Sequence, residues 1–365
     1  MMRRLSCVLC LLFSISHLAS AQEKKIKVEF NKNIELICAL NNLISTEFLK
    51  DSVADPYLYH TTRLMRLNYE HFRSYSQHPA VVTIQQMSDK IGTGVYLLGL
   101  FYKPLPEVEQ QYPVSEVILQ AIHPNLDSAN QLVKAYFEQL AHFYLDTHFE
   151  EYFASNQSLY QLVIQEVSRN MPGNRFVPTL EAYYGAKKDD YHVIAMPFFK
   201  SNWGNSWQIE HKGKFQVYNI VSPLQAQVLG SNQRVLEAGY NNAAEIRNLS
   251  VHEFGHSFVN PFTMRAPYEE QINQYKHLFK PIPKNGQYSD WLTIFNEHMV
   301  RAGEIRIALQ LGQEKESKRL QEAYKDWMYM PHFLEQLKQY EKNRKKYKRF
   351  EDYLPVLIAS LAHLK

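Results

Sequence analysis

Residues 242–261 read NAAEIRNLSVHEFGHSFVNP, and the interpretation of the C-terminal half of the chain depends on this stretch. Asn242 precedes Glu245 by three residues, which is the spacing of a helix-capping box. No proline follows until Pro261, and an Asn-Pro pair is a common end of a helix. The stretch therefore predicts one long helix that the Asn-Pro pair terminates.

Two histidines of this stretch, His252 and His256, are four residues apart and so share one face of the expected helix. Imidazoles one helical turn apart can bind a single Zn²⁺ at about 2.0–2.1 Å. Glu253 is rotated slightly off that face, where its carboxylate can reach a water on the metal. Phe254 and Gly255 are uncharged, which is typical of a buried metal helix. A mid-helix glycine costs about 1 kcal/mol relative to alanine, so Gly255 indicates close approach of a second backbone or a ligand.

A catalytic zinc ion keeps one position for water and so needs a third protein ligand. The acidic candidates downstream are Glu269, Glu270, Asp290, Glu297 and Glu304. Residues 296–306 are expected to be helical, and on that helix Glu297, Arg301 and Glu304 form one stripe. From the residues alone, this stripe is either part of a metal site or a salt-bridge ladder on the surface.

The H-E-x-x-H motif on one helix, followed by Asn-Glu at 296–297 on a later one, resembles the gluzincin metallopeptidases, the group that includes thermolysin. The resemblance implies that His252, His256 and Glu297 bind Zn²⁺. It also implies that Glu253 is the general base, which activates a zinc-associated water for hydrolysis of a peptide bond. A peptide or protein is then the expected substrate.

The chain departs from the thermolysin pattern at Arg301. Thermolysin-like sequences have an aspartate there, which orients a zinc-binding histidine. Glu304 is the candidate for that role in this chain. An oxyanion stabiliser is also needed, and the sequence does not rank its candidates. These are Arg301, His298, Tyr268, Tyr275 and Tyr288.

The chain also resembles a family of uncharacterised exported bacterial proteins that carry this motif. The resemblance rests on Glu35-Leu36, on residues 252–261 and on residues 298–302. It brings no known substrate.

The first 21 residues predict a secretory signal peptide. Arg3 and Arg4 precede the apolar run 5–15, and Ala19-Ser20-Ala21 offers a cleavage site. We therefore expect an exported protein, periplasmic or secreted. No later stretch reaches the roughly 18 to 20 apolar residues of a membrane helix, so stable membrane insertion is not expected. The mature chain would keep one cysteine, Cys38, which excludes a disulfide framework within the chain.

The pattern of the whole chain predicts a predominantly helical α+β protein. Residues 22–185 form a mostly helical N-terminal part, 186–312 a small antiparallel sheet with a metallopeptidase-like core, and 313–365 C-terminal helices packed on that core. The sheet is expected from strands at 191–196 and 214–221, joined through turn residues at 203–206. One of these strands could lie at a sheet edge beside the cleft and pair with a peptide.

Composition excludes other classes of protein. The chain has 365 residues, 45% of them hydrophobic, and a net charge of +3, which excludes a disordered chain and gives no electrostatic reason to expect a nucleic acid partner. Two alternatives to a peptidase stay open. One is a secreted binding or structural protein that retains a zinc site, and the other is a zinc hydrolase of amides or esters other than peptides.

Overall fold

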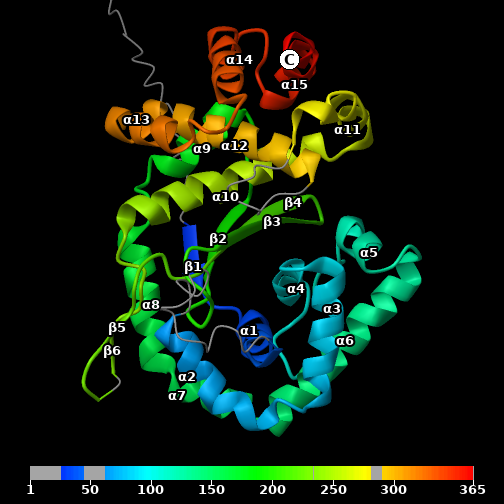
Figure 1. The fold of residues 1–365 in the computed structure, drawn as a ribbon, viewed down its shortest axis with the longest axis vertical. Coiled ribbons are helices and arrows are strands. Elements are labelled where there is room, and N and C mark those ends of the chain that lie inside the picture. The colour runs from blue at the N-terminus through cyan, green and yellow to red at the C-terminus, as the bar shows by residue number, and fades with distance from the viewer. Residues whose placement is uncertain (1–25, 45–61, 233, 281–289, 365) are drawn as a thin grey trace, which may run out of the picture.

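The structure is a computed structural model, and it describes residues 26–44, 62–232, 234–280 and 290–364. The predicted signal peptide at residues 1–21 lies outside the described residues. The fold is predominantly helical α+β, as the sequence predicted. Figure 1 shows a small sheet near the middle of the molecule, with α1, α2 and α7 below it and α13, α14 and α15 above.

The main sheet has four strands in the order β1-β2-β4-β3. The strands are β1 (Ile26–Glu29), β2 (Asp190–Ala195), β3 (Gly204–His211) and β4 (Lys214–Val221). β1 and β4 both pair in parallel with β2, whereas β3 pairs antiparallel with β4. β3 is therefore an edge strand. A second, two-stranded antiparallel sheet consists of β5 (Val228–Leu229) and β6 (Val235–Glu237).

The pairing expected for the main sheet was wrong. β2 and β4 lie side by side but run parallel, so they do not form a hairpin. The hairpin is β3–β4, and its connection is Lys212-Gly213, both with positive φ. Two consecutive residues with positive φ make the turn that suits the twist of paired strands. Gly204, Asn205 and Ser206, expected in a turn, begin β3.

Most of the helices between β1 and β2 form the lower part of the molecule in Figure 1, but the last of them lies above the sheet. They are α1 (Lys32–Ile44), α2 (Arg63–Phe72), α3 (Pro79–Ile91), α4 (Gly94–Leu97), α5 (Glu116–Ile122), α6 (Leu126–Asp146), α7 (Phe149–Ser155), α8 (Gln157–Asn170) and α9 (Phe176–Tyr184). Because β1 precedes these helices and pairs with β2, the N-terminal part contributes a strand to the sheet.

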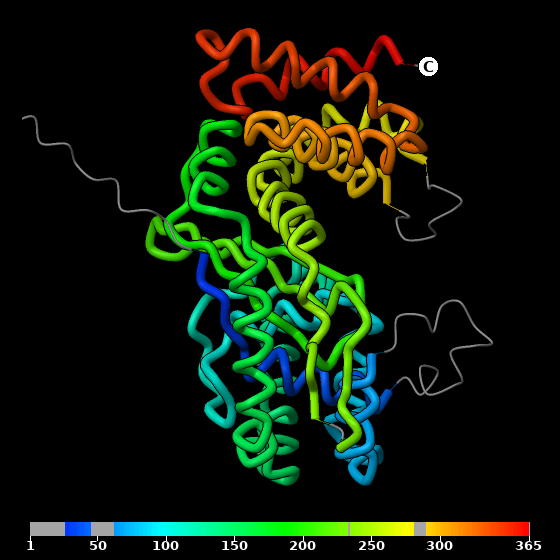
Figure 2. The backbone as a smooth tube through the Cα atoms, turned by 90° about the vertical axis from the view of Figure 1, so that its left-hand side faces the viewer, coloured from blue at the N-terminus to red at the C-terminus, as the bar shows by residue number. Residues whose placement is uncertain are grey.

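Helices after the sheet carry the predicted motif and then gather at one end, as the side view in Figure 2 shows in yellow to red. They are α10 (Ala243–Thr263), α11 (Ala266–Asn273), α12 (Trp291–Gln310), α13 (Glu314–Ala323), α14 (Met330–Lys342) and α15 (Phe350–Ser360). Single 3₁₀ turns lie at Arg73–Tyr75, Leu98–Leu100, Lys276–Leu278 and Leu361–His363. None of the helices in the described ranges has both the length and the apolar character that crossing a bilayer takes.

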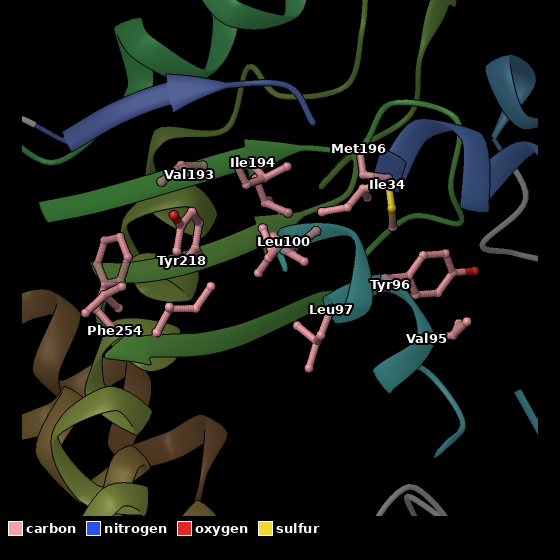
Figure 3. Packing of buried hydrophobic residues seen from close by; sticks show 14 of the residues in the cluster. Ile34, Val95, Tyr96, Leu97, Leu100, Val193, Ile194, Met196, Tyr218 and Phe254 are labelled. Carbon is pink, nitrogen blue, oxygen red and sulfur yellow. The ribbon is translucent and has the colours of Figure 1, made fainter. Parts of the chain in front are cut away.

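One apolar core joins the sheet to helices on both of its sides. Tyr191 of β2 packs edge-on against Phe254 of α10, with ring centroids 5.2 Å apart. Leu97, the last residue of α4, and Leu100, in the 3₁₀ turn that follows, belong to the same buried cluster as Val193 of β2 (Figure 3). The core therefore fixes α10 directly against the sheet.

Candidate metal centre and its cleft

α10 carries both histidines of the motif. Its first turn is capped by Asn242, whose side-chain oxygen accepts a hydrogen bond from Glu245 N at 3.2 Å, as the sequence predicted. The sequence predicted that Pro261 ends the helix, and this prediction was wrong. Pro261 lies two residues before Thr263, where α10 ends, so the helix continues past a proline that cannot donate a backbone hydrogen bond. The helix places Nε2 of His256 3.2 Å from Nε2 of His252.

α12 brings the third member of the site. Glu297 Oε2 lies 3.5 Å from His252 Nε2, and its Oε1 lies 3.4 Å from His256 Nε2. Asp290 caps α12 by accepting a hydrogen bond from Thr293 N at 2.7 Å, so this acid starts the helix instead of joining the site. His252, His256 and Glu297 thus form a group that could hold a metal ion.

Glycines allow the two helices to cross closely. A Cβ on Gly255 of α10 would lie 3.1 Å from Val300 Cγ1 of α12, so Gly255 is closely approached by a side chain and not by the second backbone or ligand that the sequence predicted. A Cβ on Gly303 would lie 2.5 Å from the hydroxyl of Tyr184. A larger residue at Gly255 would require Val300 to shift by a few tenths of an ångström, and one at Gly303 would require the Tyr184 side chain to move.

Each histidine has an oxygen atom near its outer nitrogen, which is an ion-pair contact for His252 and a hydrogen bond for His256. Glu304 Oε2 lies 3.5 Å from His252 Nδ1 and accepts a hydrogen bond from the Tyr324 hydroxyl at 2.8 Å. His256 Nδ1 lies 3.2 Å from Asn260 Oδ1. Such partners fix the orientation of an imidazole ring. The sequence had suggested Glu304, but Asn260 and Tyr324 were missed. Asn260 was detectable from its spacing of four residues from His256.

Arg301 lies beside the carboxylate of Glu297. Its Nη2 is 2.9 Å from Glu297 Oε2, and its guanidinium lies between the rings of Tyr324 and Trp327, at 4.8 and 4.7 Å from their centroids. The arginine at the position of the thermolysin aspartate therefore pairs with the acidic member of the site. It does not orient a histidine.

Charges within the group determine its protonation in the absence of a cation. Burial lowers the pKa of His252, but the carboxylates of Glu297 and Glu304 outweigh burial and raise this pKa to about 10. Burial raises the pKa of Glu297, but His252, His256 and Arg301 outweigh it and hold this pKa well below its usual range. Glu297 is therefore ionised, which is the state that a metal ligand needs.

Glu253 lies next to the group and reaches the cleft. Its side chain is largely buried, and its Oε1 would be 3.0 Å from a Cβ on Gly204, the first residue of β3. Among the described residues, none forms a hydrogen bond or ion pair with this carboxylate. It is therefore available to a ligand in the cleft.

His298 lies away from the group, although the sequence offered it as an oxyanion stabiliser. Its Nδ1 donates a hydrogen bond to the Ile294 carbonyl at 2.7 Å, and its ring packs against Trp327 and Phe333. Burial lowers its pKa to about 4, so the ring is a neutral part of the core. Tyr268 and Tyr275 are not part of the cleft wall in the described structure, and Tyr288 lies outside the described residues.

A cleft of about 1180 Å³ opens over the group. Its walls are one face of α10, one face of α12, the edge strand β3 and the segment between α4 and α5 of the N-terminal part. His252, Glu253, His256, Glu297 and Arg301 all line it. The cleft is larger than the roughly 300–1,000 Å³ of small-molecule pockets, and it leads from the surface to the metal-binding group.

Comparisons with known proteins give a family but no activity. The family described as "Domain of unknown function (DUF4932)" matches residues 26–360. No curated protein and no solved structure matched the chain. The matched range includes every element from β1 to α15, so the metal-binding group and the cleft lie within it.

Proposed function

The chain belongs to the DUF4932 family, and we propose from its residues that it is a zinc-dependent metallopeptidase. The observation that carries the proposal is the approach of His252, His256 and Glu297 to within 3.2–3.5 Å of one another at the floor of an open cleft. We further propose export to the periplasm or medium, from the sequence of residues 1–21.

The donor set suits Zn²⁺. Four ligands placed tetrahedrally at about 2.0–2.1 Å are separated from one another by about 3.3 Å. The separations among His252 Nε2, His256 Nε2 and the Glu297 oxygens are 3.2, 3.4 and 3.5 Å. Two imidazoles and one carboxylate favour zinc over calcium or magnesium, which take oxygen ligands. Three protein ligands also leave one position open, as catalytic sites do.

The residues around the cation have separate tasks in the proposed reaction. A Zn²⁺ ion in this group would polarise a peptide carbonyl and lower the pKa of a water molecule. Glu253 accepts the proton of that water and passes it to the leaving amine. Glu304 and Asn260 hold the two imidazole rings in place. Arg301 compensates the negative charge of Glu297 through its contact with Oε2.

The edge strand supplies a means of binding a peptide. β3 lines the cleft along most of its length, and it lies at the end of the strand order. An edge strand presents backbone N–H and C=O groups that can pair with an extended chain. This feature favours a peptide over a small amide as the substrate. The sequence predicted that β2 or β4 lies at the sheet edge beside the cleft, but the strand at that position is β3.

The experiment is a comparison of Glu253→Gln with Glu270→Gln in the full chain. Glu270 is an exposed acid on α11 and does not line the cleft. We expect Glu253→Gln to keep its zinc and to lose about 10²- to 10⁴-fold in cleavage of a mixed peptide pool, because general base catalysis contributes that much. Glu270→Gln should match the native chain in both measurements. Equal cleavage by both variants would remove Glu253 as the base. A zinc-loaded native chain that cleaves no peptide would refute the peptidase.

A further inference from the structure

The cleft follows the whole length of α10. From Glu245 to Arg265, just past the end of the helix, the residues that line it recur at intervals of three and four. This is the periodicity of a single helical face, and the stretch spans about 30 Å at 1.5 Å per residue. The cleft is therefore a channel along the helix and not a pit above the metal-binding group.

The metal-binding histidines lie near the middle of this channel. Glu245 and Asn248 line it on the N-terminal side of His252, and Met264 and Arg265 line it beyond His256. We infer that the channel binds an internal segment of an extended polypeptide, so that the protein is an endopeptidase that cuts bonds away from chain ends. The inference rests on the proposed function and specifies its substrate class.

β3 runs beside α10 in the same direction. Gly204, at its start, lies against Leu249, since a Cβ there would be 2.7 Å from Leu249 Cδ1. Gln208, further along, accepts a hydrogen bond from Lys188, whose Nζ lies 4.9 Å from the centroid of the Phe258 ring. The edge strand thus accompanies the helix past both histidines, from the level of Leu249 to that of Phe258.

The backbone groups of β3 alternate between β4 and the free edge. Ser222 N donates a hydrogen bond to the Trp203 carbonyl at 3.0 Å, which fixes the phase of the antiparallel pair at the start of the strand. The alternation then directs the N–H and C=O groups of Gly204, Ser206, Gln208 and Glu210 away from β4. These residues span about 20 Å, which suits a bound segment of roughly six residues.

Apart from Glu253, the two charged side chains next to the metal-binding group in the cleft, Arg301 and Glu304, are engaged within the protein. Arg301, which could capture a substrate carboxylate, pairs with Glu297 and lies between two rings. Glu304, which could capture a substrate amine, is next to His252 and bonded to Tyr324. An exopeptidase needs such a group to hold a free terminus. In the described part of the channel these two charges have other tasks, which favours internal cleavage.

The test uses the zinc-loaded full chain and a pool of decapeptides made in two forms, one with free ends and one N-acetylated and C-amidated. Products are identified by mass spectrometry. We expect internal cleavage, with the same bonds cut at unchanged kcat/KM in both forms. Release of single terminal residues, or loss of cleavage on blocking the ends, would overturn the inference and leave the peptidase standing. Absence of cleavage in both forms would overturn both.

A second measurement tests the role of β3 separately. Ser206→Pro removes one N–H from the free edge, and proline is tolerated at edge positions of this kind. We expect KM for the blocked decapeptides to rise about fivefold, the effect of one lost hydrogen bond of typical strength, with kcat and zinc content unchanged. A substrate N-methylated at single positions should show the same loss at alternate residues with the native chain. Unchanged KM in both tests would exclude pairing with β3.

Discussion

Two buried glutamates in different regions of the molecule have opposite properties. Glu297 of α12 is 5% exposed, and the charges of His252 and Arg301 hold its pKa well below the usual range. Glu35 of α1 is 1% exposed, and burial raises its pKa to about 8, although the Tyr160 hydroxyl donates a hydrogen bond to it at 3.1 Å. The same residue type is thus a charged ligand candidate in one region and a neutral core residue in the other.

The two side chains are buried to a similar extent. They differ in their partners and in whether they line the cleft. Glu297 faces two imidazoles and a guanidinium and lines the cleft. Glu35 faces a hydroxyl, its Oε1 has no hydrogen-bond partner among the described residues, and it is not among the residues that line the cleft. A buried acid is therefore weak evidence of a functional site until its partners and its path to solvent are known.

We expect the largest effect from replacing Glu297 by glutamine, and the same replacement at Glu35 serves as the comparison. Glu297→Gln should lower zinc affinity by more than about 100-fold and abolish peptide cleavage, because replacing even an outer partner of a ligand costs about 10- to 100-fold. Glu35→Gln should keep zinc and activity. Zinc content after dialysis and cleavage of a peptide pool are the measurements. Equal zinc retention by the two variants would contradict the assignment of Glu297.

The pH dependence of stability should reveal the opposite state of Glu35. Its folded pKa of about 8 lies above the unfolded value of 4.5, so the folded chain binds the extra proton between these values. Stability from this group is complete below pH 4.5 and is lost as pH rises through 8, by about 1.4 kcal/mol per unit. Glu35→Gln, which mimics the neutral acid, should remove this slope from thermal unfolding midpoints. Glu138→Gln, at an exposed acid of α6, is the control. An unchanged slope in Glu35→Gln would mean that Glu35 is ionised.

Local spacing explains what the sequence predicted correctly. Asn242 as a cap and the placement of His252 and His256 on one face both follow from the geometry of one helix. The helix around Glu297 was also predicted, but its approach to the histidines was implied by resemblance and not by spacing. Contacts between helices depend on how the whole core packs.

The features that the sequence missed depend on distant parts of the chain. The parallel pairing of β2 with β4 needs a connection that returns the chain along the sheet, and here that connection includes β3. β3 was not predicted because Trp203-Gly204-Asn205-Ser206 has the composition of a turn. Tyr324 reaches Glu304 only because α13 folds back on α12. His298 follows Glu297 directly in sequence, but the helix turns it toward a different set of neighbours.

The close crossing of α10 and α12 is a further property that distinguishes the metal region. Gly303→Ala would place a methyl group 2.5 Å from the Tyr184 hydroxyl, so we expect a loss of about 1–3 kcal/mol in stability and weaker zinc binding. Tyr184→Phe removes that hydroxyl and should restore part of both in the double variant. Gly173→Ala, where a Cβ meets nothing within 4 Å, is the control. No rescue by Tyr184→Phe would mean that another contact sets the distance between the helices.

The smallest effects on zinc affinity are expected from substitutions at Glu304 and Tyr324. They test whether Glu304 orients His252 or binds the metal ion itself. Glu304→Gln should weaken zinc binding about 10- to 100-fold, because it weakens the contact that orients His252. Tyr324→Phe removes only the hydrogen bond to Glu304, so a weakening of about fivefold is expected. Competition with a chelator gives both affinities, and extracted zinc gives the stoichiometry. If Glu304→Gln lost more zinc than Glu297→Gln, Glu304 would be the third ligand, and Glu297 would serve chiefly to balance the charge of Arg301.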